Sequence, residues 1–311
     1  MIAARRDHGC YRVRVRIGVV FPQTEIGADP AVIRAYVAAA EELGYAHILA
    51  YDHVLGADPK GHPGFRGPYT VDSTFHEPFV LYGYLAALTS LELVTGVIIL
   101  PQRQTALVAK QAAEVDLLTE GRFRLGVGIG WNRVEYEALA KDFTDRGRRV
   151  SEQVELLRRL WTEPVVTFRG RYETVTAAGL APMPVQRPIP IWFGADSPPA
   201  WRRAGRLADG WFPQMSPGPR LDEAVAFVRE GAESAGRDPS TLGMEGRASL
   251  SRGVDVAAER VAAWRSAGAT HVCVNTMGIG GAGAGAVGVD RHIAALAEMA
   301  AAIGLPPRPV S

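Results

Sequence analysis

Short hydrophobic runs alternate with longer segments of helical periodicity along most of this chain. The strand-like runs, rich in β-branched and aromatic residues, span residues 14–21, 47–51, 91–100, 123–127, 189–195, 210–213, 242–250 and 271–276. The helix-like segments span residues 30–43, 78–89, 105–118, 134–141, 146–161, 198–207, 221–234, 256–267 and 292–303. About eight rounds of strand and helix predict an α/β fold of the (β/α)8 TIM-barrel type, with an open, doubly wound sheet as the structural alternative.

Two long departures from this alternation are predicted to be insertions in the barrel. The first is a Gly- and Pro-rich loop over residues 55–76, which follows the second strand. The second covers residues 134–188 and contains two helices and a small hairpin. The first helix has clear boundary signals, because Asp29 suits the N-cap, Pro30 suits the first turn and Gly44 suits the end.

Length and composition set the broad class of the protein. A chain of 311 residues with 47% hydrophobic residues can bury a sizeable core, and we predict one barrel domain over residues 13–305, a loose extension at 1–12 and a tail at 306–311. A net charge of +1 argues against a nucleic-acid surface, and no run approaches the roughly 18 apolar residues of a membrane span. Two isolated cysteines, Cys10 and Cys273, and the absence of a signal peptide favour a reducing, cytoplasmic location.

The residues that follow each strand are the first candidates for chemistry, because barrel enzymes place their active sites at the carboxyl ends of the strands. The second strand ends in Asp52 and His53, and a histidine there can donate a hydrogen bond or act as a general acid near neutral pH. A loop pair that is hydrogen-bonded locally is the alternative. His62 and His76 follow, but no two of these histidines have a spacing that suits a ligand pair, so we predict no metal site.

A second candidate is the turn Gly194-Ala195-Asp196-Ser197, which precedes a helix that opens with Pro198. Gly194 allows close approach to the backbone, and free N–H groups at a helix N-terminus attract a phosphate. The alternative is an ordinary turn in which Asp196 or Ser197 caps the helix.

Glycines interrupt two of the predicted strands. Gly96 marks a bulge or a close backbone approach, unless it only relieves packing. Gly126, Gly128 and Gly130 form a G-x-G-x-G run, which differs from the G-x-G-x-x-G fingerprint of dinucleotide-binding folds. We interpret this run as a strand end that passes flat against something large, and Trp131 after it either lines that surface or joins the core.

Several motifs together give the chain a family resemblance. They are Asp52-His53 and the segments 95–139 (TGVIILPQRQTALVAKQAAEVDLLTEGRFRLGVGIGWNRVEYEAL), 156–175 (LLRRLWTEPVVTFRGRYETV), 188–213 (PIPIWFGADSPPAWRRAGRLADGWFP) and 271–278 (HVCVNTMG). From about residue 14 to 303 the chain resembles the luciferase-like monooxygenase superfamily, and within it the branch that uses the deazaflavin coenzyme F420. The motifs are more specific for the superfamily than for the coenzyme, since flavin-using relatives share much of the pattern.

The resemblance implies a cofactor ring that lies across the strand ends of the barrel. It implies that His53 is the catalytic proton donor or hydrogen-bond partner, that Gly96–Val97 is a bulge, often a cis peptide, and that Gly194 to Ser197 hold the cofactor's phosphate. The implied cofactor-binding set is Asp52, His53, Gly96, Val97, Gly128, Gly130, Trp131, Gly194, Ala195, Asp196 and Ser197.

One departure from the family pattern bears on the substrate. Related sugar-phosphate and alcohol dehydrogenases have a glutamate after the glycines, where this chain has Trp131, and their phosphate-clamping lysines have no obvious match. We therefore expect a small hydrophobic substrate, uncharged or weakly polar, rather than a sugar phosphate. Phe65 and Tyr69, carried by the loop 55–76, and Trp131 are predicted to line its pocket, with Trp131 and Trp192 near the ring.

The predicted function is hydride transfer between coenzyme F420 and this small-molecule substrate. The alternatives are an FMN-dependent monooxygenase supplied by a separate reductase, and a protein that binds a flavin or deazaflavin without turnover. A metal-dependent barrel hydrolase is disfavoured, because no strand carries paired histidines. We predict no nucleic-acid or membrane partner and a possible homodimer, and we interpret the Gly/Ala-rich stretch 278–288 as a connection without a role.

Overall fold

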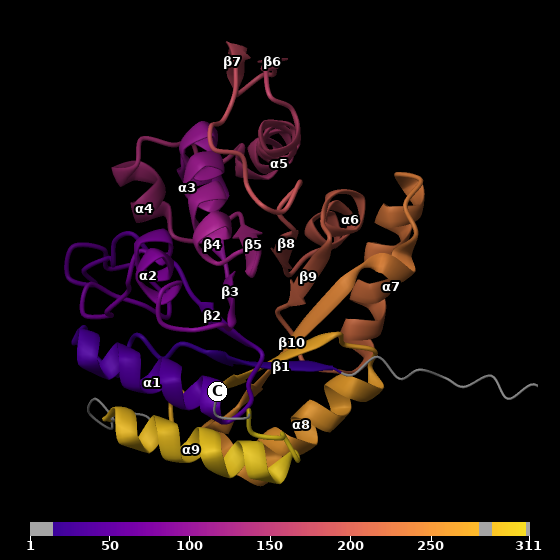
Figure 1. Ribbon diagram of the computed structural model, residues 1–311. Coiled ribbons are helices and arrows are strands. Elements are labelled where there is room, and N and C mark those ends of the chain that lie inside the picture. The colour runs from indigo at the N-terminus through magenta and orange to yellow at the C-terminus, as the bar shows by residue number, and fades with distance from the viewer. Residues whose placement is uncertain (1–14, 280–287, 309–311) are drawn as a thin grey trace, which may run out of the picture.

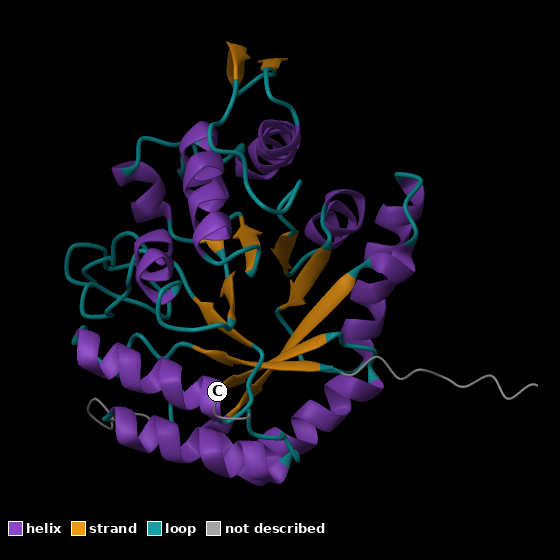
Figure 2. Cartoon of the chain, in the orientation of Figure 1, coloured by secondary structure: helices purple, strands orange, loops and turns teal. Residues whose placement is uncertain are grey.

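The computed structural model describes residues 15–279 and 288–308 and forms a closed parallel barrel surrounded by helices (Figures 1 and 2). The predicted extension at 1–12, nearly all of the stretch 278–288 and the last three residues of the tail lie outside the described residues.

The elements follow the predicted order closely. The barrel strands are β1 (Arg16–Val20), β2 (His47–Ala50), β3 (Glu92–Thr95), β4 (Ile98–Ile99), β5 (Phe123–Gly128), β8 (Ile191–Ala195), β9 (Gly210–Pro213), β10 (Gly243–Ser249) and β11 (His271–Asn275). The helices are α1 (Pro30–Glu42), α2 (Pro78–Leu85), α3 (Thr105–Leu118), α4 (Arg133–Ala138), α5 (Arg146–Thr162), α6 (Pro198–Leu207), α7 (Pro219–Ser234), α8 (Val254–Ser266) and α9 (Val289–Ala302). Short 3-10 turns occupy Leu100–Gln102, Pro239–Thr241 and Leu250–Arg252.

The sheet closes on itself, which confirms the barrel and excludes the open sheet. Its order is β3-β2-β1-β11-β10-β9-β8-β5-β4, all neighbours are parallel, and an additional β3–β5 pairing completes the ring. The strands β3 and β4 are two parts of one barrel position, so the described residues form a barrel of eight positions.

The break between β3 and β4 corrects the prediction of one strand over residues 91–100. The Gly96–Val97 peptide bond is cis, as the family resemblance implied. A side chain has no room at this point, because a Cβ on Gly96 would lie 2.2 Å from Leu49 Cδ2. The glycine is therefore a site of close approach inside the barrel.

Local signals at the first helix and the hairpin are confirmed. The Asp29 side chain accepts a hydrogen bond from the Ala31 N–H at 2.8 Å, and Gly44 has φ +86° just after α1. The hairpin consists of β6 (Val166–Arg169) and β7 (Thr174–Ala178), which pair antiparallel.

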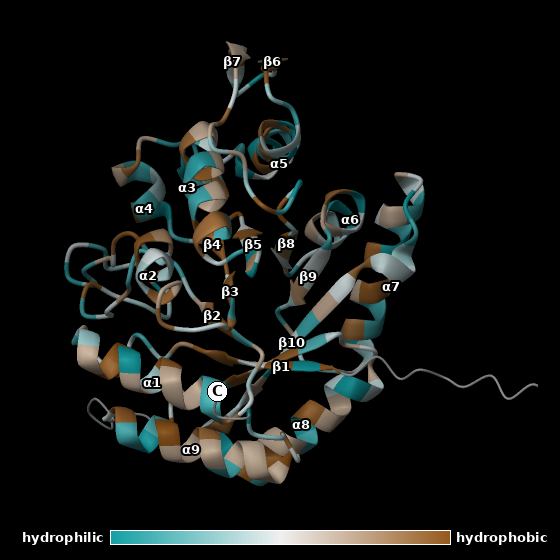
Figure 3. Cartoon of the chain, viewed as in Figure 1, coloured by the Kyte–Doolittle hydropathy of each residue, from teal (hydrophilic) through white to brown (hydrophobic). Residues whose placement is uncertain are grey.

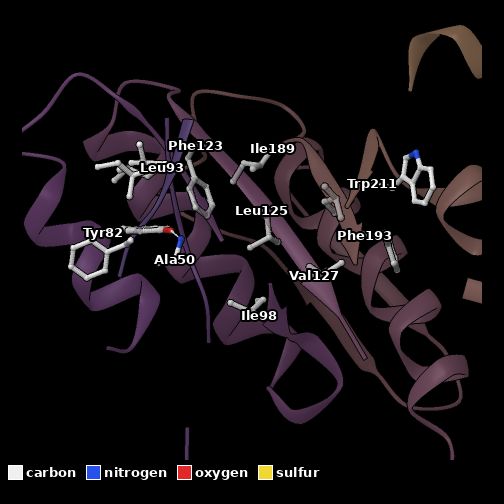
Figure 4. Packing of buried hydrophobic residues seen from close by; sticks show 14 of the residues in the cluster. Ala50, Tyr82, Leu93, Ile98, Phe123, Leu125, Val127, Ile189, Phe193 and Trp211 are labelled. Atoms are coloured by element: carbon white, nitrogen blue, oxygen red, sulfur yellow. Dashed lines mark hydrogen bonds between the residues drawn. The ribbon is translucent and has the colours of Figure 1, made fainter. Parts of the chain in front are cut away.

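Strand residues alternate between the helical layer and the barrel interior. Phe123, Leu125 and Val127 of β5 pack in the main core cluster (Figure 4). Hydrophobic residues occur along the central strands, whereas α5 and α7 carry both hydrophobic and hydrophilic residues (Figure 3). Arg124 and Gly126 have the opposite parity and face the barrel interior.

The interior at the amino ends of the strands is a buried ion network. Glu245 Oε1 lies 2.8 Å from His47 Nε2, and Arg124 donates to Glu245 Oε2 at 2.7 Å. Burial alone would raise the pKa of Glu245, but Arg124 and His47 hold it well below its ordinary value. The ligand atoms of His47, Glu245 and Cys273 lie within 4.8 Å of one another, but Arg124 already supplies the positive charge there. We interpret this network as structural, as expected for this end of a barrel.

Among the described residues, no helix has both the length and the apolar character needed to cross a bilayer.

Candidate functional site

A cavity of about 480 Å³ opens at the carboxyl ends of the barrel strands. Every residue of the predicted cofactor-binding set lines it, from Asp52 and His53 after β2 to Ser197 after β8. Tyr69 of the predicted substrate pocket lines it as well, whereas Phe65 does not. Residues distant in sequence therefore meet here because parallel strands end at one edge of the barrel.

The cavity wall has no room for side chains where its glycines lie. A Cβ on Gly128 would lie 2.6 Å from Val97 Cγ2, and one on Gly130 would lie 2.8 Å from Ile99 Cγ2. Gly130 also has φ +67°, which favours glycine. These glycines leave backbone as the cavity surface, as a flat ligand requires.

His53 is paired with a buried carboxylate that the sequence analysis missed. Its Nδ1 lies 3.1 Å from Glu135 Oε1, and its side chain is 10% exposed. With Nδ1 held by the carboxylate, Nε2 is the ring nitrogen that remains for a cavity ligand. The arrangement gives the cavity one oriented imidazole.

Glu135 belongs to α4 and ties the start of the loop 55–76 to the barrel. Its Oε1 accepts hydrogen bonds from the N–H groups of Val54 at 2.8 Å and Leu55 at 3.3 Å. Burial alone would raise the pKa of Glu135, but its bonds to His53 and to these backbone groups hold it below the ordinary value. The carboxylate is therefore charged at neutral pH.

Aromatic rings surround the His53 imidazole on several sides. The ring centroids of Tyr69, Phe75 and Trp131 lie 5.1, 4.8 and 5.4 Å from that of His53. Burial raises the pKa of Tyr69 to about 12, so its hydroxyl stays protonated at neutral pH. These three aromatic rings limit the access of water to the imidazole.

Asp52, a member of the predicted cofactor-binding set, has a buried carboxylate that is paired with Arg103. Asp52 is 4% exposed, and both of its oxygens lie 3.0 Å from an Arg103 nitrogen. Burial raises the pKa of Asp52, and the adjacent Arg103 offsets part of that rise. Arg103 also binds Glu77 at 2.9 Å, so this pair joins the strand end to the start of α2. Asp52 contributes to the cavity wall, but its charge is used in this ion pair.

Arg247, on β10, also lines this cavity, and the sequence analysis did not select it. Its guanidinium binds the Gln214 side chain and lies 3.4 Å from the Tyr51 hydroxyl. No carboxylate pairs with it among the residues that the structure describes. A positive charge without an acidic partner makes this side of the cavity suitable for an anionic ligand.

The proposed phosphate turn has fewer N–H donors than an average helix start. Pro198 and Pro199 have no N–H, which leaves those of Ser197 and Ala200. The Ser197 side chain makes no capping bond, and Asp196 is paired with Arg220 at 2.7 Å, so neither residue caps α6 as the alternative expected. Pairing with Arg220 reduces the repulsion between Asp196 and a bound anion.

Trp131 separates the strand-end cavity described above from a second cavity. It is 41% exposed, lines both cavities and lies 5.7 Å from the Phe65 ring, centroid to centroid. Trp192, by contrast, is 5% exposed in the barrel interior, where Arg124 lies 4.1 Å from its ring, and it does not line the strand-end cavity. Of the two tryptophans expected near the ring, only Trp131 is at the cavity.

The histidines considered for a metal have separate environments. His62 lines the second cavity, and His76 packs against Phe21 at 6.0 Å between ring centroids. His53 is paired with Glu135.

Comparison with known proteins places this geometry in a family context. The family model described as luciferase-like monooxygenase matches residues 15–306. The chain is 36% identical over 211 residues to an uncharacterized protein of Mycobacterium tuberculosis, covering 64% of this chain and 70% of that one. It is 33% identical over 258 residues to the F420-dependent hydroxymycolic acid dehydrogenase of the same species, covering 80% of this chain and 66% of that one. The solved structure of an F420-dependent secondary alcohol dehydrogenase with an F420–acetone adduct shares the fold, with TM-score 0.75, 18% identity and coverage of 93% and 99%.

Proposed function

This chain belongs to the luciferase-like monooxygenase family, and from that premise we propose that it is an F420-dependent oxidoreductase. The observation that carries the proposal is the His53–Glu135 pair in a cavity whose wall includes Gly128 and Gly130. The F420-dependent hydroxymycolic acid dehydrogenase and its 33% identity support the choice of coenzyme.

The residues present fit a deazaflavin in shape and charge. Gly128 and Gly130 leave no side chain on one wall, and Val97 and Ile99 supply an apolar surface beside them. Arg247 offers a positive charge without a carboxylate partner among the described residues, which suits an anionic cofactor. When bound, a deazaflavin supplies two-electron hydride chemistry and does not readily activate oxygen.

The chain's own residues supply orientation and proton handling. Glu135 orients His53 through Nδ1, and Nε2 is left to hold or accept a proton next to a substrate. Tyr69, Phe75 and Trp131 exclude water around that nitrogen. These aromatic rings around His53 favour a substrate whose reacting part is hydrophobic and uncharged, such as an enone, an imine or an alcohol.

The first experiment is a titration of the purified protein with oxidised F420 and with FMN. Because Trp131 lies at the cavity, F420 binding should quench tryptophan fluorescence, and the Trp131→Phe variant should lose most of that quenching. Tight binding of F420 with weak binding of FMN supports the proposal. The reverse preference, together with oxygen uptake in the presence of reduced FMN, would identify a flavin-dependent monooxygenase instead.

Replacing His53 separates an enzyme from a protein that only binds the coenzyme. We expect His53→Gln to retain F420 affinity and to lower turnover by about 10²–10⁴-fold, the usual contribution of a general acid or base. The rate is followed by the absorbance of oxidised F420 with a panel of alcohols, enones and imines. An unchanged rate would remove His53 from the chemistry.

A further inference from the structure

The second cavity has a volume of about 790 Å³ and lies on the other side of Trp131 from the cofactor cavity. One wall is the segment Gly61–Pro68 of the loop that follows β2, and the other is Trp131–Val134 at the start of α4. The Trp131 ring contacts His53 on one side and Phe65 on the other. Only the Trp131 ring therefore separates the second cavity from a molecule that reacts beside His53.

The lining of this cavity combines apolar walls with positive charge. Pro63, Phe65 and Val134 are among the apolar residues, and Arg66 and Arg133 are the charged ones. No aspartate or glutamate belongs to the lining, and neither arginine has a carboxylate partner in the described part of the chain. Such a surface favours a hydrocarbon or aryl chain that ends in an anion over a cationic or a wholly polar ligand.

The two arginines are held in place by other contacts, so their charges are fixed at the cavity. Arg66 donates to the carbonyl oxygens of Pro63 at 3.2 Å and Phe65 at 2.9 Å. The Arg133 guanidinium stacks on the Phe143 ring at 4.2 Å. Charges held in this way lose little side-chain entropy when an anion binds.

This inference rests on the proposed function. We propose that the second cavity binds the distal part of the substrate, which is an elongated apolar chain with an anionic end. The reacting group then lies beside His53, and Trp131 separates the two halves of the substrate. Binding of part of the cofactor in this cavity is the competing outcome, and the F420 titration distinguishes it.

The test measures binding of decanoate, hexanoate, decanol and decyltrimethylammonium to the cofactor-free protein by calorimetry. If the cavity buries the chain, decanoate should bind more tightly than hexanoate by up to about fourfold per added methylene. Decanoate should also bind more tightly than decanol and much more tightly than the cationic probe. Equal affinities across the four probes would overturn the proposal.

A matched pair of glycine variants locates the binding. A Cβ at Gly64 or at Gly83 meets nothing within 4 Å, and Gly64 lines the second cavity whereas Gly83 lies on α2 outside it. We expect Gly64→Glu to weaken decanoate binding about tenfold by charge repulsion, and Gly83→Glu to leave it unchanged. Val134→Glu, on the opposite wall, should behave as Gly64→Glu does, and equal losses in all three variants would contradict the assignment.

Parallel titration with F420 separates this inference from the proposed function. F420 affinity should be the same in the wild type, Gly64→Glu and Val134→Glu, which also shows that the variants are folded. If Gly64→Glu weakens F420 as much as decanoate, the cavity holds the cofactor and not the substrate. If the wild type binds decanoate as described but not F420, the proposed function fails while the anion-binding cavity stands.

Discussion

Glu135 is the residue on which the candidate site depends most, and replacing it tests the reasoning directly. The side chain is 1% exposed, and its Oε1 accepts from the Val54 N–H at 2.8 Å and lies 3.1 Å from His53 Nδ1. In Glu135→Ala, the N–H groups of Val54 and Leu55, the His53 ring nitrogen and the Gln102 side-chain amide lose their acceptor. An unsatisfied buried donor costs about 1–3 kcal/mol, but Val54 and Leu55 are exposed residues whose N–H groups water can reach, so we expect a loss of about 2–3 kcal/mol in total.

Glu135→Gln should be much milder, because an amide oxygen can still accept both hydrogen bonds. It loses the charge assistance, which is worth about 1 kcal/mol, and the long 3.4 Å bond that Oε2 accepts from the Gln102 amide. The assay is urea unfolding at pH 7, with Glu137→Ala, at an exposed position of the same helix, as the control expected within about 0.5 kcal/mol of the wild type.

A second readout follows the loop itself. Since Glu135 binds Val54 and Leu55 at its start, Glu135→Ala should speed proteolytic cleavage within residues 55–76 while Glu137→Ala does not. If Glu135→Ala is as stable and as resistant as Glu137→Ala, the carboxylate does not hold the loop or His53, and the proposed role of the pair is wrong.

Two further predictions concern charges inside the barrel. Arg247→Gln should raise the dissociation constant of F420 about tenfold without lowering stability, because it removes a cation that has no carboxylate partner among the described residues; titration and urea unfolding check both parts. Glu245→Gln removes the closer carboxylate partner of the buried Arg124, at 2.7 Å, and leaves Glu92 at 3.3 Å. It should therefore cost about 3 kcal/mol at neutral pH, the lower end of the range for a broken buried pair. The pKa of Glu245 is held well below its ordinary value, so its contribution is complete above about pH 4.3, where an unfolded glutamate titrates, and is lost as the pH falls toward the folded-state pKa. Urea unfolding from pH 7 to pH 3 should therefore show the wild type approaching the variant in acid, and a constant difference would contradict the sign.

The barrel was predictable because its signals are local and repeated. Each strand and helix carries its own periodicity, and the order of elements then leaves few topologies. The interruption at Gly96 was visible as a glycine in an apolar run, but the split of that run into β3 and β4 depends on the close contact with Leu49, which no local pattern encodes. The expected homodimer stays a prediction.

The site was predictable only where strand ends mark it. Asp52, His53 and Gly194 to Ser197 lie at or just past the ends of β2 and β8, so the barrel rule alone selects them. Glu135 lies in the first turn of α4, and Arg247 lies within β10, so their position at the cavity depends on tertiary packing. The sequence did contain a signal for Glu135, which is a glutamate in the first turn of a helix that follows a glycine-rich strand end.

The positions of the carboxylates decide which group can move a proton in this cavity. The position after the glycines holds Trp131 and not a carboxylate, and Asp52 and Asp196 are each paired with an arginine. Glu135 also lines the cavity, but its Oε1 is bonded to His53 and to the N–H groups of Val54 and Leu55, so it orients the ring. Proton transfer in the proposed reaction therefore depends on the single imidazole of His53, which is why its replacement should affect rate and leave coenzyme binding intact.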